Sequence, residues 1–171
     1  MATASITPQR DTVLAEIFIA APPERVFQAI TDPQQMSNWW GQNGLYRITE
    51  RGADVRPGGK WWCTGLGADG TKFGVEGEYL EIDPPRRLVH TWIATYMGTL
   101  KTTVYWDLHP QAVHGLHPSG PKKAGTGTLV KLRHEGFTDA QSAQSHGDGW
   151  KRVFGWLEGY VERGETIDTR P

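Results

Sequence analysis

Cysteine is almost absent from this sequence: Cys63 stands alone among 171 residues, so no disulfide can form within the chain. A single thiol fits a reducing compartment, and we expect a cytoplasmic protein. There is no apolar run of about 18 residues, which excludes a typical membrane-spanning helix. The first residues, MATASITPQRDT, lack the basic and apolar stretches of a secretion signal, so we expect none.

Charge of one sign is also lacking. The sequence has 18 basic and 19 acidic residues, which leaves a formal net charge of -1. Nucleic-acid-binding proteins typically carry a basic excess or a basic stripe, and neither is present here. We therefore expect no nucleic-acid partner and no membrane partner.

One short string matches the sequence pattern of a dinucleotide-binding site. Residues 65–70 read GLGADG, which matches the G-x-G-x-x-G pattern of a dinucleotide-binding loop. Such a loop must begin a helix, because the helix N-terminus holds the pyrophosphate. Here the string leads into TKFGVEGEYLEI, which is typical of a strand, and Asp69-Gly70 is a strong hairpin signal. We predict a hairpin at this point, with no NAD and no other cofactor.

Tryptophan and glycine are abundant, with 8 and 21 residues respectively. Glycine at this density favours many tight turns, as in an antiparallel sheet, and large rings can line a concave binding site. The apolar run over residues 13–20 predicts a first strand. Two short helices should follow, one opened by Pro22-Pro23-Glu24 and one over residues 33–40 capped by Asp32.

Beyond the second helix the pattern changes. Between Gly44 and Gly136, turn signals separate about six short runs rich in β-branched and aromatic residues, which predicts an antiparallel meander. From Trp150 to Val161, apolar residues recur at the spacing of an amphipathic helix. We therefore predict an α+β fold in which a curved sheet closes over a long C-terminal helix. Residues 1–12 and 164–171 should be flexible ends.

This order of elements resembles the START-like (SRPBCC) superfamily, and within it the group named after the activator of the 90-kDa heat-shock protein ATPase. The matching strings are Ile19-Ala20-Ala21-Pro22, Val26-Phe27, Thr31-Asp32-Pro33, Trp39-Trp40, Pro57-Gly58-Gly59, Pro84-Pro85-Arg86-Arg87-Leu88, Thr91-Trp92, Gly127-Thr128, His134-Glu135-Gly136-Phe137, His146 and Gly149-Trp150. The resemblance runs from about residue 13 to residue 162. No single string is diagnostic, whereas the ordered series is specific.

The resemblance implies a helix-grip fold: two small helices and a curved antiparallel sheet of about seven strands around a C-terminal helix, with a cavity between helix and sheet. It also implies one domain over residues 13–163. Members of the superfamily bind apolar or aromatic small molecules, act as cyclases, or serve as co-chaperone-like domains, and they share no catalytic set. One departure is an insertion at residues 110–124, which could form a lid or a contact surface.

The predicted cavity needs a lining, and large rings with a few polar points are the usual form of one. An equally ordinary interpretation of the same side chains is core packing. The candidate ligand-binding residues are Trp40, Trp62, His90, Trp92, Trp106, His134, Trp150 and Phe154. Of these, His90 and His134 alternate with apolar neighbours on predicted strands, so each is either a hydrogen-bonded core histidine or a polar fixture of the cavity.

Two further groups of residues are of types that can carry chemistry. Glu76 and Glu78 alternate in step with Leu80 and Ile82, which should face the core. Either a bulge at Gly77 turns the glutamates outward, or they point toward the core, where they could act as an acid–base pair. Solvent exposure is the expectation, because unpaired carboxylates are rarely buried. The series His109, His114 and His117 has a spacing that could ligate metal, although it lies in a glycine- and proline-rich loop. We assign no metal ligand and no catalytic residue.

Three functions remain open at this point. The first is a binding protein that holds an apolar or aromatic small molecule between sheet and helix. The second is a protein-interaction module resembling the co-chaperone domain, with a chaperone or another protein as partner. The third is a cyclase- or hydrolase-like enzyme that uses His134, His90 or the two glutamates.

Overall fold

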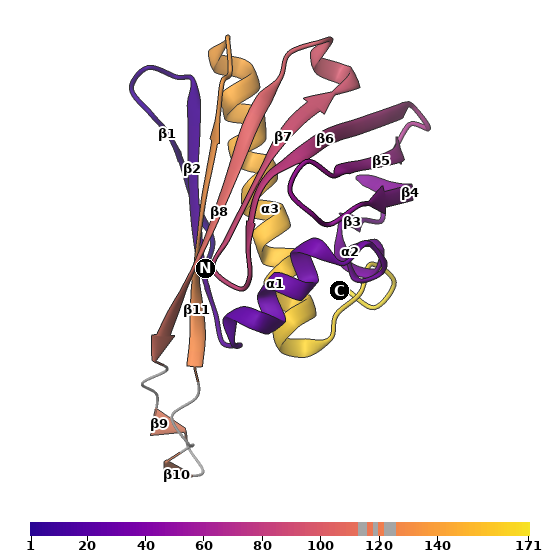
Figure 1. The fold of residues 1–171 in the computed structure, drawn as a ribbon. Coiled ribbons are helices and arrows are strands. Elements are labelled where there is room, and N and C mark those ends of the chain that lie inside the picture. Colours follow the sequence, from indigo (N-terminus) through magenta and orange to yellow (C-terminus); the bar gives the residue numbers. More distant parts are fainter. Residues whose placement is uncertain (113–115, 118–119, 122–125) are drawn as a thin grey trace.

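The computed structural model describes residues 1–112, 116–117, 120–121 and 126–171. In this part of the chain, one antiparallel sheet of nine strands curves around a long C-terminal helix (Figure 1). Its strands, in the order in which they lie side by side, are β1 (Thr3–Ile6), β2 (Thr12–Ile19), β11 (Thr126–Glu135), β8 (Thr102–Ala112), β7 (Arg87–Ala94), β6 (Lys72–Asp83), β5 (Lys60–Gly67), β4 (Tyr46–Ala53) and β3 (Gly41–Gln42). The helix-grip fold and the α+β class are confirmed, with two more strands than the expected seven.

The helices also follow the predicted order. After β2 come α1 (Pro23–Thr31) and α2 (Pro33–Trp39), and the side chain of Asp32 caps α2 by accepting a hydrogen bond from the Gln34 N–H at 3.0 Å. A short 3-10 helix, η1 (Thr95–Met97), follows β7. The C-terminal helix α3 (Ala140–Arg163) begins ten residues before Trp150, because Asp139 caps it through the Ser142 N–H at 2.7 Å.

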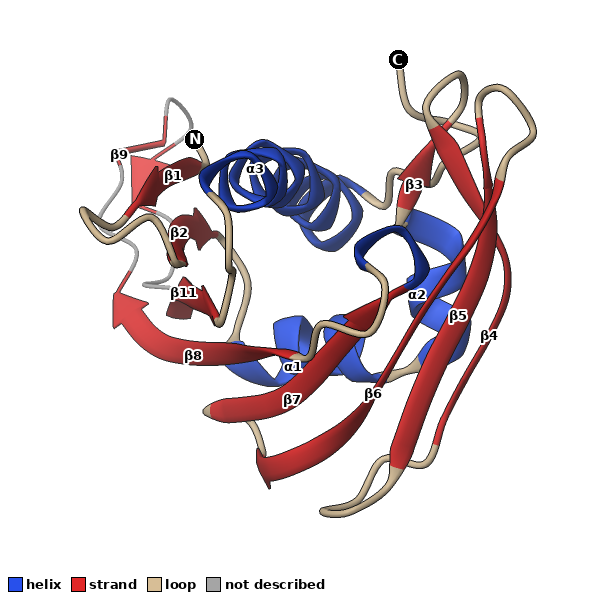
Figure 2. Cartoon of the chain, turned by 90° about the horizontal axis from the view of Figure 1, so that it is seen from above, coloured by secondary structure: helices blue, strands red, loops and turns tan. Residues whose placement is uncertain are grey.

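Seen from above, the sheet curves around α3 (Figure 2). The apolar face of α3, which includes Trp150, Val153, Phe154 and Leu157, is buried. This helix packs closely against β1 and β2 at one side of the sheet and against α1 and α2. Strands β4 to β6 lie on the opposite side of the curve, away from α3, which leaves the space described in the next subsection.

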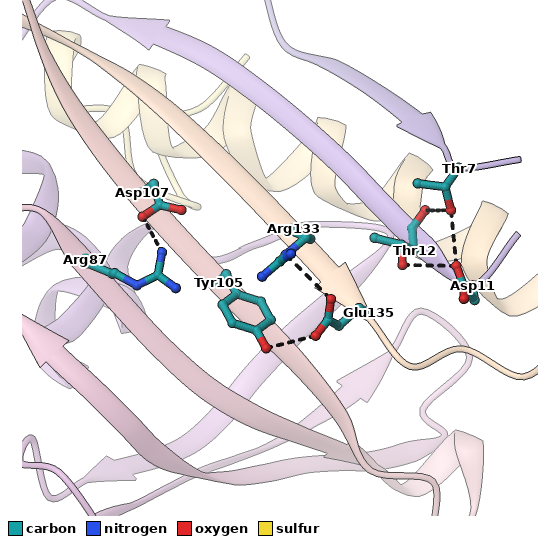
Figure 3. Close-up of polar contacts among 8 residues, drawn as sticks. All are labelled: Thr7, Asp11, Thr12, Arg87, Tyr105, Asp107, Arg133 and Glu135. Atoms are coloured by element: carbon teal, nitrogen blue, oxygen red, sulfur yellow. Dashed lines mark hydrogen bonds and ion pairs between the residues drawn. The ribbon is translucent and has the colours of Figure 1, made fainter. Parts of the chain in front are cut away.

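Alternation along the central strands separates a polar outer face from an apolar inner one. On the outer face, Arg87 of β7 pairs with Asp107 of β8 at 2.6 Å, and the Tyr105 hydroxyl donates to Glu135 of β11 at 2.8 Å (Figure 3). The inward residues of β8 and β11 are buried, as their spacing predicted: Val104, Trp106 and Leu108, and Thr128, Val130, Leu132 and His134.

The hairpin predicted at the glycine-rich string is confirmed. Gly70 adopts a φ of 82°, and its N–H donates to the Gly67 carbonyl at 3.0 Å. The chain then continues directly into β6, so no helix N-terminus stands at this point to receive a pyrophosphate.

The N-terminal segment differs from the prediction of a flexible end. Residues 3–6 form β1, which pairs with β2 from Ile6 opposite Val13 to Thr3 opposite Glu16. The Ile6 side chain lies against Gly147 of α3, where a larger residue would keep the strand away. A four-residue strand with a mixed pattern gives little signal in sequence, because the contact that stabilises it is tertiary.

The C-terminal tail was also expected to be flexible, and it instead packs against α2. Ile167 is buried, and its N–H donates to the Asn38 carbonyl at 2.9 Å. The Arg170 guanidinium donates to the carbonyls of Trp39 and Gly41 at 3.0 and 2.6 Å. The bonds to Asn38 and Trp39 satisfy carbonyls at the end of α2 that have no partner within the helix.

The predicted insertion begins where β8 and β11 extend beyond the rest of the sheet (Figure 1). Two short strands, β9 (Leu116–His117) and β10 (Gly120–Pro121), pair within it. Residues 113–115, 118–119 and 122–125, which include His114, lie outside the described residues, as does the side chain of His117, while His109 is an exposed residue of β8. Within the described chain, no helix has the length and apolarity needed to cross a membrane.

Candidate ligand-binding cavity

A cavity of about 710 Å³ lies between α3, α2 and the inner face of β4 to β7. Aromatic rings form much of its wall. Trp150 of α3 lies 5.9 Å from Trp40 and 5.8 Å from Trp92, measured between ring centroids, and Trp92 lies 5.6 Å from Trp61. Tilted and edge-on contacts of this kind stabilise aromatic clusters beyond the area they bury. Three of the predicted residues, Trp40, Trp92 and Trp150, therefore line the cavity.

Trp62 does not line this cavity, and its neighbour Trp61 faces the cavity instead. Trp62 is 42% exposed on the outer face of β5, whereas the Trp61 indole donates to the Thr91 carbonyl at 3.2 Å. Gly77 makes room for the Trp61 ring, since a β-carbon at this position would collide with it. The sequence did contain a signal: Trp62 shares its strand face with the polar Lys60 and Thr64.

A smaller pocket of about 40 Å³ adjoins the main cavity and shares Trp40, Trp61 and Trp92 with it. The predicted residues His90 and Trp106 border this smaller pocket, and Trp62 reaches its edge. His134 and Phe154 are fully buried in the core and border neither space.

Hydrogen bonds fix the protonation state of His90. The Trp106 indole N–H donates to His90 Nε2 at 3.1 Å, so Nε2 must be an unprotonated acceptor. The other ring nitrogen, Nδ1, lies 3.1 Å from the Thr91 carbonyl and therefore carries the proton. The ring is neutral, and burial lowers the pKa of His90 to about 4.

His134 is fixed in the opposite tautomer. The Trp150 indole donates to its Nδ1 at 3.1 Å. Its Nε2 lies 2.7 Å from the Thr102 hydroxyl, which itself donates to the Trp92 carbonyl at 3.1 Å, so Nε2 must be the donor. Burial, followed by the neighbouring His146 and His90, lowers the pKa of His134 well below its usual value. Both histidines therefore act as neutral connectors within the core.

The two glutamates point away from the cavity, as expected. Glu76 is exposed, and Glu78 forms an ion pair with Lys60 at 2.7 Å. The bulge proposed at Gly77 lies a little further along, where the pairing of β6 with β7 shifts between Tyr79 and Glu81. Leu80, expected to face the core, is 51% exposed as a result of sharing the outer face with the glutamates.

Sequence reasoning missed the polar groups that do line the cavity, above all Arg51. Strict alternation from Tyr46 and Ile48 would turn Glu50 inward and Arg51 outward. The pairing of β4 with β5 shifts between Ile48 and Glu50, and this irregularity turns Arg51 into the cavity. Burial lowers the pKa of the Arg51 guanidinium. Such a bulge cannot be predicted from the periodicity of the sequence.

Further polar side chains line the main cavity, among them Cys63, Tyr96 and His146. The Cys63 thiol lies on β5 opposite Arg51, and burial raises its pKa. His146 Nδ1 lies 2.8 Å from the Ser142 carbonyl, so Nδ1 carries the proton and Nε2 faces the Tyr96 hydroxyl at 3.5 Å. Burial also lowers the pKa of His146. Across the described ranges, no cluster of three or more potential ligands could hold a metal ion.

These observations define a helix-grip protein with an aromatic-lined cavity between its sheet and its C-terminal helix. The family model described as "Activator of Hsp90 ATPase homolog 1-like protein" matches residues 20–115, more than half of the chain. The chain belongs to this family.

Solved structures share the fold over nearly the whole chain. Protein CV1439 from Chromobacterium violaceum is 26% identical with a TM-score of 0.70, over 89% of this chain and 98% of the other. CalU16 from Micromonospora echinospora is 25% identical with a TM-score of 0.63, over 96% and 74% of the two chains. A Rhodobacter sphaeroides protein is 19% identical with a TM-score of 0.72, over 95% and 98%. The comparison with curated proteins found no match.

Proposed function

We propose that this protein binds an apolar or aromatic small molecule in the cavity between β4–β7 and α3. The observation that carries the proposal is the cavity itself, whose volume of about 710 Å³ lies within the range of small-molecule sites, roughly 300–1,000 Å³. Its aromatic walls with a few polar points are the usual lining of such sites. Mass spectrometry under native conditions, on protein purified without added ligand, is the direct way to find a bound compound.

Gly149 offers a way to fill the cavity without disturbing the core. This glycine of α3 lines the cavity, and a β-carbon added to it would meet open space. We expect Gly149→Phe to weaken binding of the uncharged aromatic probe N-phenyl-1-naphthylamine by about tenfold or more, a loss of about 1.4 kcal/mol. The helix should not be weakened, because glycine is a poorer helix former than phenylalanine. Probe fluorescence measures binding, and urea unfolding checks stability.

Gly155 provides the matched control on the same helix. It is exposed, borders neither pocket, and also has open space around an added β-carbon. Gly155→Phe should gain the same helix propensity while binding the probe as the unaltered protein does. Equal affinity of the Gly149→Phe and Gly155→Phe variants would place the probe outside the cavity and contradict the proposal.

A second proposal, that the protein acts as an interaction module, is supported by the family match alone. The family description names an activator of the Hsp90 ATPase. Co-purification of the protein with the 90-kDa chaperone, followed by an ATPase assay, tests this activity in our chain. The absence of any association would remove the second proposal and leave the first untouched.

The catalytic alternative lacks support from the geometry of its candidate residues. Glu76 and Glu78 face solvent, and both ring nitrogens of His90 and His134 are engaged in hydrogen bonds. A general base needs a free ring nitrogen within reach of its substrate.

A further inference from the structure

The charged residues that line the cavity are all basic. Arg51, Lys72 and Arg152 line the main cavity, and neither pocket has an aspartate or glutamate among the described residues that line it. The chain as a whole has a formal net charge of -1, so this positive bias is local. A cavity with cationic and apolar walls favours a ligand that is apolar over most of its surface and carries a negative group.

Arg51 is the cation placed deepest in this arrangement. It lines both the main cavity and the smaller pocket, so it lies where the two meet. Its guanidinium carbon lies 5.8 Å from the centre of the Trp40 ring, and its Nε is buried without a hydrogen-bond partner. Among described residues, no carboxylate lies within ion-pair distance of Arg51.

Other arginines of the sheet are paired, which makes this position unusual. Arg47, on the same strand, forms an ion pair with Asp168 at 3.1 Å, and Arg87 pairs with Asp107 at 2.6 Å. A buried cation without a counter-ion is unfavourable, because it loses hydration and gains no opposite charge. A bound anion would remove this penalty.

The smaller pocket supplies a place for such an anion. Its volume of about 40 Å³ suits a group of a few atoms, and it is bordered by Arg51 and Tyr79. Arg51 presents planar N–H groups that match the two oxygens of a carboxylate. Tyr79 borders the same pocket, and its hydroxyl can serve as a second donor.

We propose that Arg51 binds the carboxylate of an amphiphilic acid whose apolar or aromatic body fills the main cavity. The inference rests on the proposed function and adds the chemical class of the ligand. Lys72 and Arg152, both exposed and at the lining of the main cavity, attract the acid before it enters.

The test compares two ligands with the same apolar body, dodecanoate and dodecan-1-ol, as competitors of N-phenyl-1-naphthylamine. The unaltered protein should bind dodecanoate about tenfold to 100-fold more tightly, which is the range expected for a charge-assisted hydrogen bond. Arg51→Met should abolish this preference and leave the affinity for dodecan-1-ol unchanged. Arg51→Lys should keep part of the preference, because it keeps the charge and loses the planar donor pair.

Arg47→Met is the matched control, since it removes an arginine from the same strand that faces solvent. It should keep the full preference for dodecanoate. Equal binding of both ligands by the unaltered protein would overturn this inference while the proposed function stands, and that comparison needs no variant to fold. A preference that survives Arg51→Met and disappears in Lys72→Met or Arg152→Met would also overturn it. Failure of both ligands to bind would overturn the inference and count against the proposed function.

Discussion

Replacing His134 by alanine is expected to lower the free energy of unfolding by about 4 kcal/mol. The ring is fully buried and joins three elements. His134 lies on β11, accepts a hydrogen bond from the Trp150 indole of α3 and donates one to the Thr102 hydroxyl of β8. Its removal leaves a cavity and an indole N–H without a partner, and each of these changes is destabilising by itself. Urea unfolding at pH 7.5, followed by tryptophan fluorescence, measures the change.

His146→Ala is the control for this prediction. Its ring lies 5.3 Å from that of His134, but it is only partly buried, and its closest hydrogen bond is to Ser142 of its own helix. We expect its removal to change the free energy of unfolding by less than about 1 kcal/mol. If the two alanine variants were equally stable, the hydrogen-bonded connection through His134 would not hold the helix to the sheet.

This connection also shapes the cavity. Trp150 forms part of the cavity wall, and its indole is held by His134. Trp92 is another wall residue. Its backbone carbonyl accepts a hydrogen bond from the Thr102 hydroxyl, which in turn accepts one from His134. The predicted site residue His134 therefore acts on the cavity by positioning two tryptophans, although it does not border the space itself.

The sequence predicted the frame of the molecule because its signals are local. The caps at Asp32 and the hairpin at Asp69-Gly70 depend on neighbouring residues, and the alternation of Val104, Trp106 and Leu108 reports directly which face meets the core. These signals do not require knowledge of distant contacts. They were therefore sufficient to predict the element order and a curved sheet closed over a C-terminal helix, while the helix-grip fold was implied by the family resemblance.

The features that the sequence did not reveal depend on contacts between distant residues. Strand β1 is stabilised where Ile6 meets Gly147, and the C-terminal tail is held where Arg170 meets the end of α2. Arg51 enters the cavity through a shift in the pairing of β4 with β5, which reverses the side-chain alternation. Strict alternation would therefore place Arg51, the buried cation of the cavity, on the outer face of the sheet.

Acidification should destabilise the protein well above the pH at which carboxylates titrate. In the unfolded chain a histidine has a pKa of about 6.5. In the fold, burial lowers the pKa of His90 to about 4, and burial and neighbouring histidines lower the pKa of His134 well below its usual value. At a pH between the folded and the unfolded pKa, these histidines are protonated in the unfolded chain and neutral in the folded chain. Stability is therefore complete above about pH 6.5 and falls as the pH decreases, by about 1.4 kcal/mol per pH unit for each histidine.

With two such histidines, the free energy of unfolding should decrease by about 5 kcal/mol between pH 6.5 and pH 4.5. The partly buried His146, whose pKa is also lowered, should add a smaller decrease in the same direction. Asp69, Glu78, Asp139 and Glu165 have lowered pKa values, so in the fold they remain ionised through this window. Urea unfolding at constant ionic strength across the window measures the slope.

The ring nitrogens of the two histidines offer an independent check in the folded state. NMR should find His90 protonated at Nδ1 and His134 protonated at Nε2, because each indole N–H occupies the opposite nitrogen. Neither ring should gain a second proton at pH 5. Protonation of either ring near pH 6 in the folded protein would contradict the assigned tautomers, since an imidazolium would set two N–H donors against each other. The slope of stability with pH would then be shallower, because the folded chain would bind the same protons as the unfolded one.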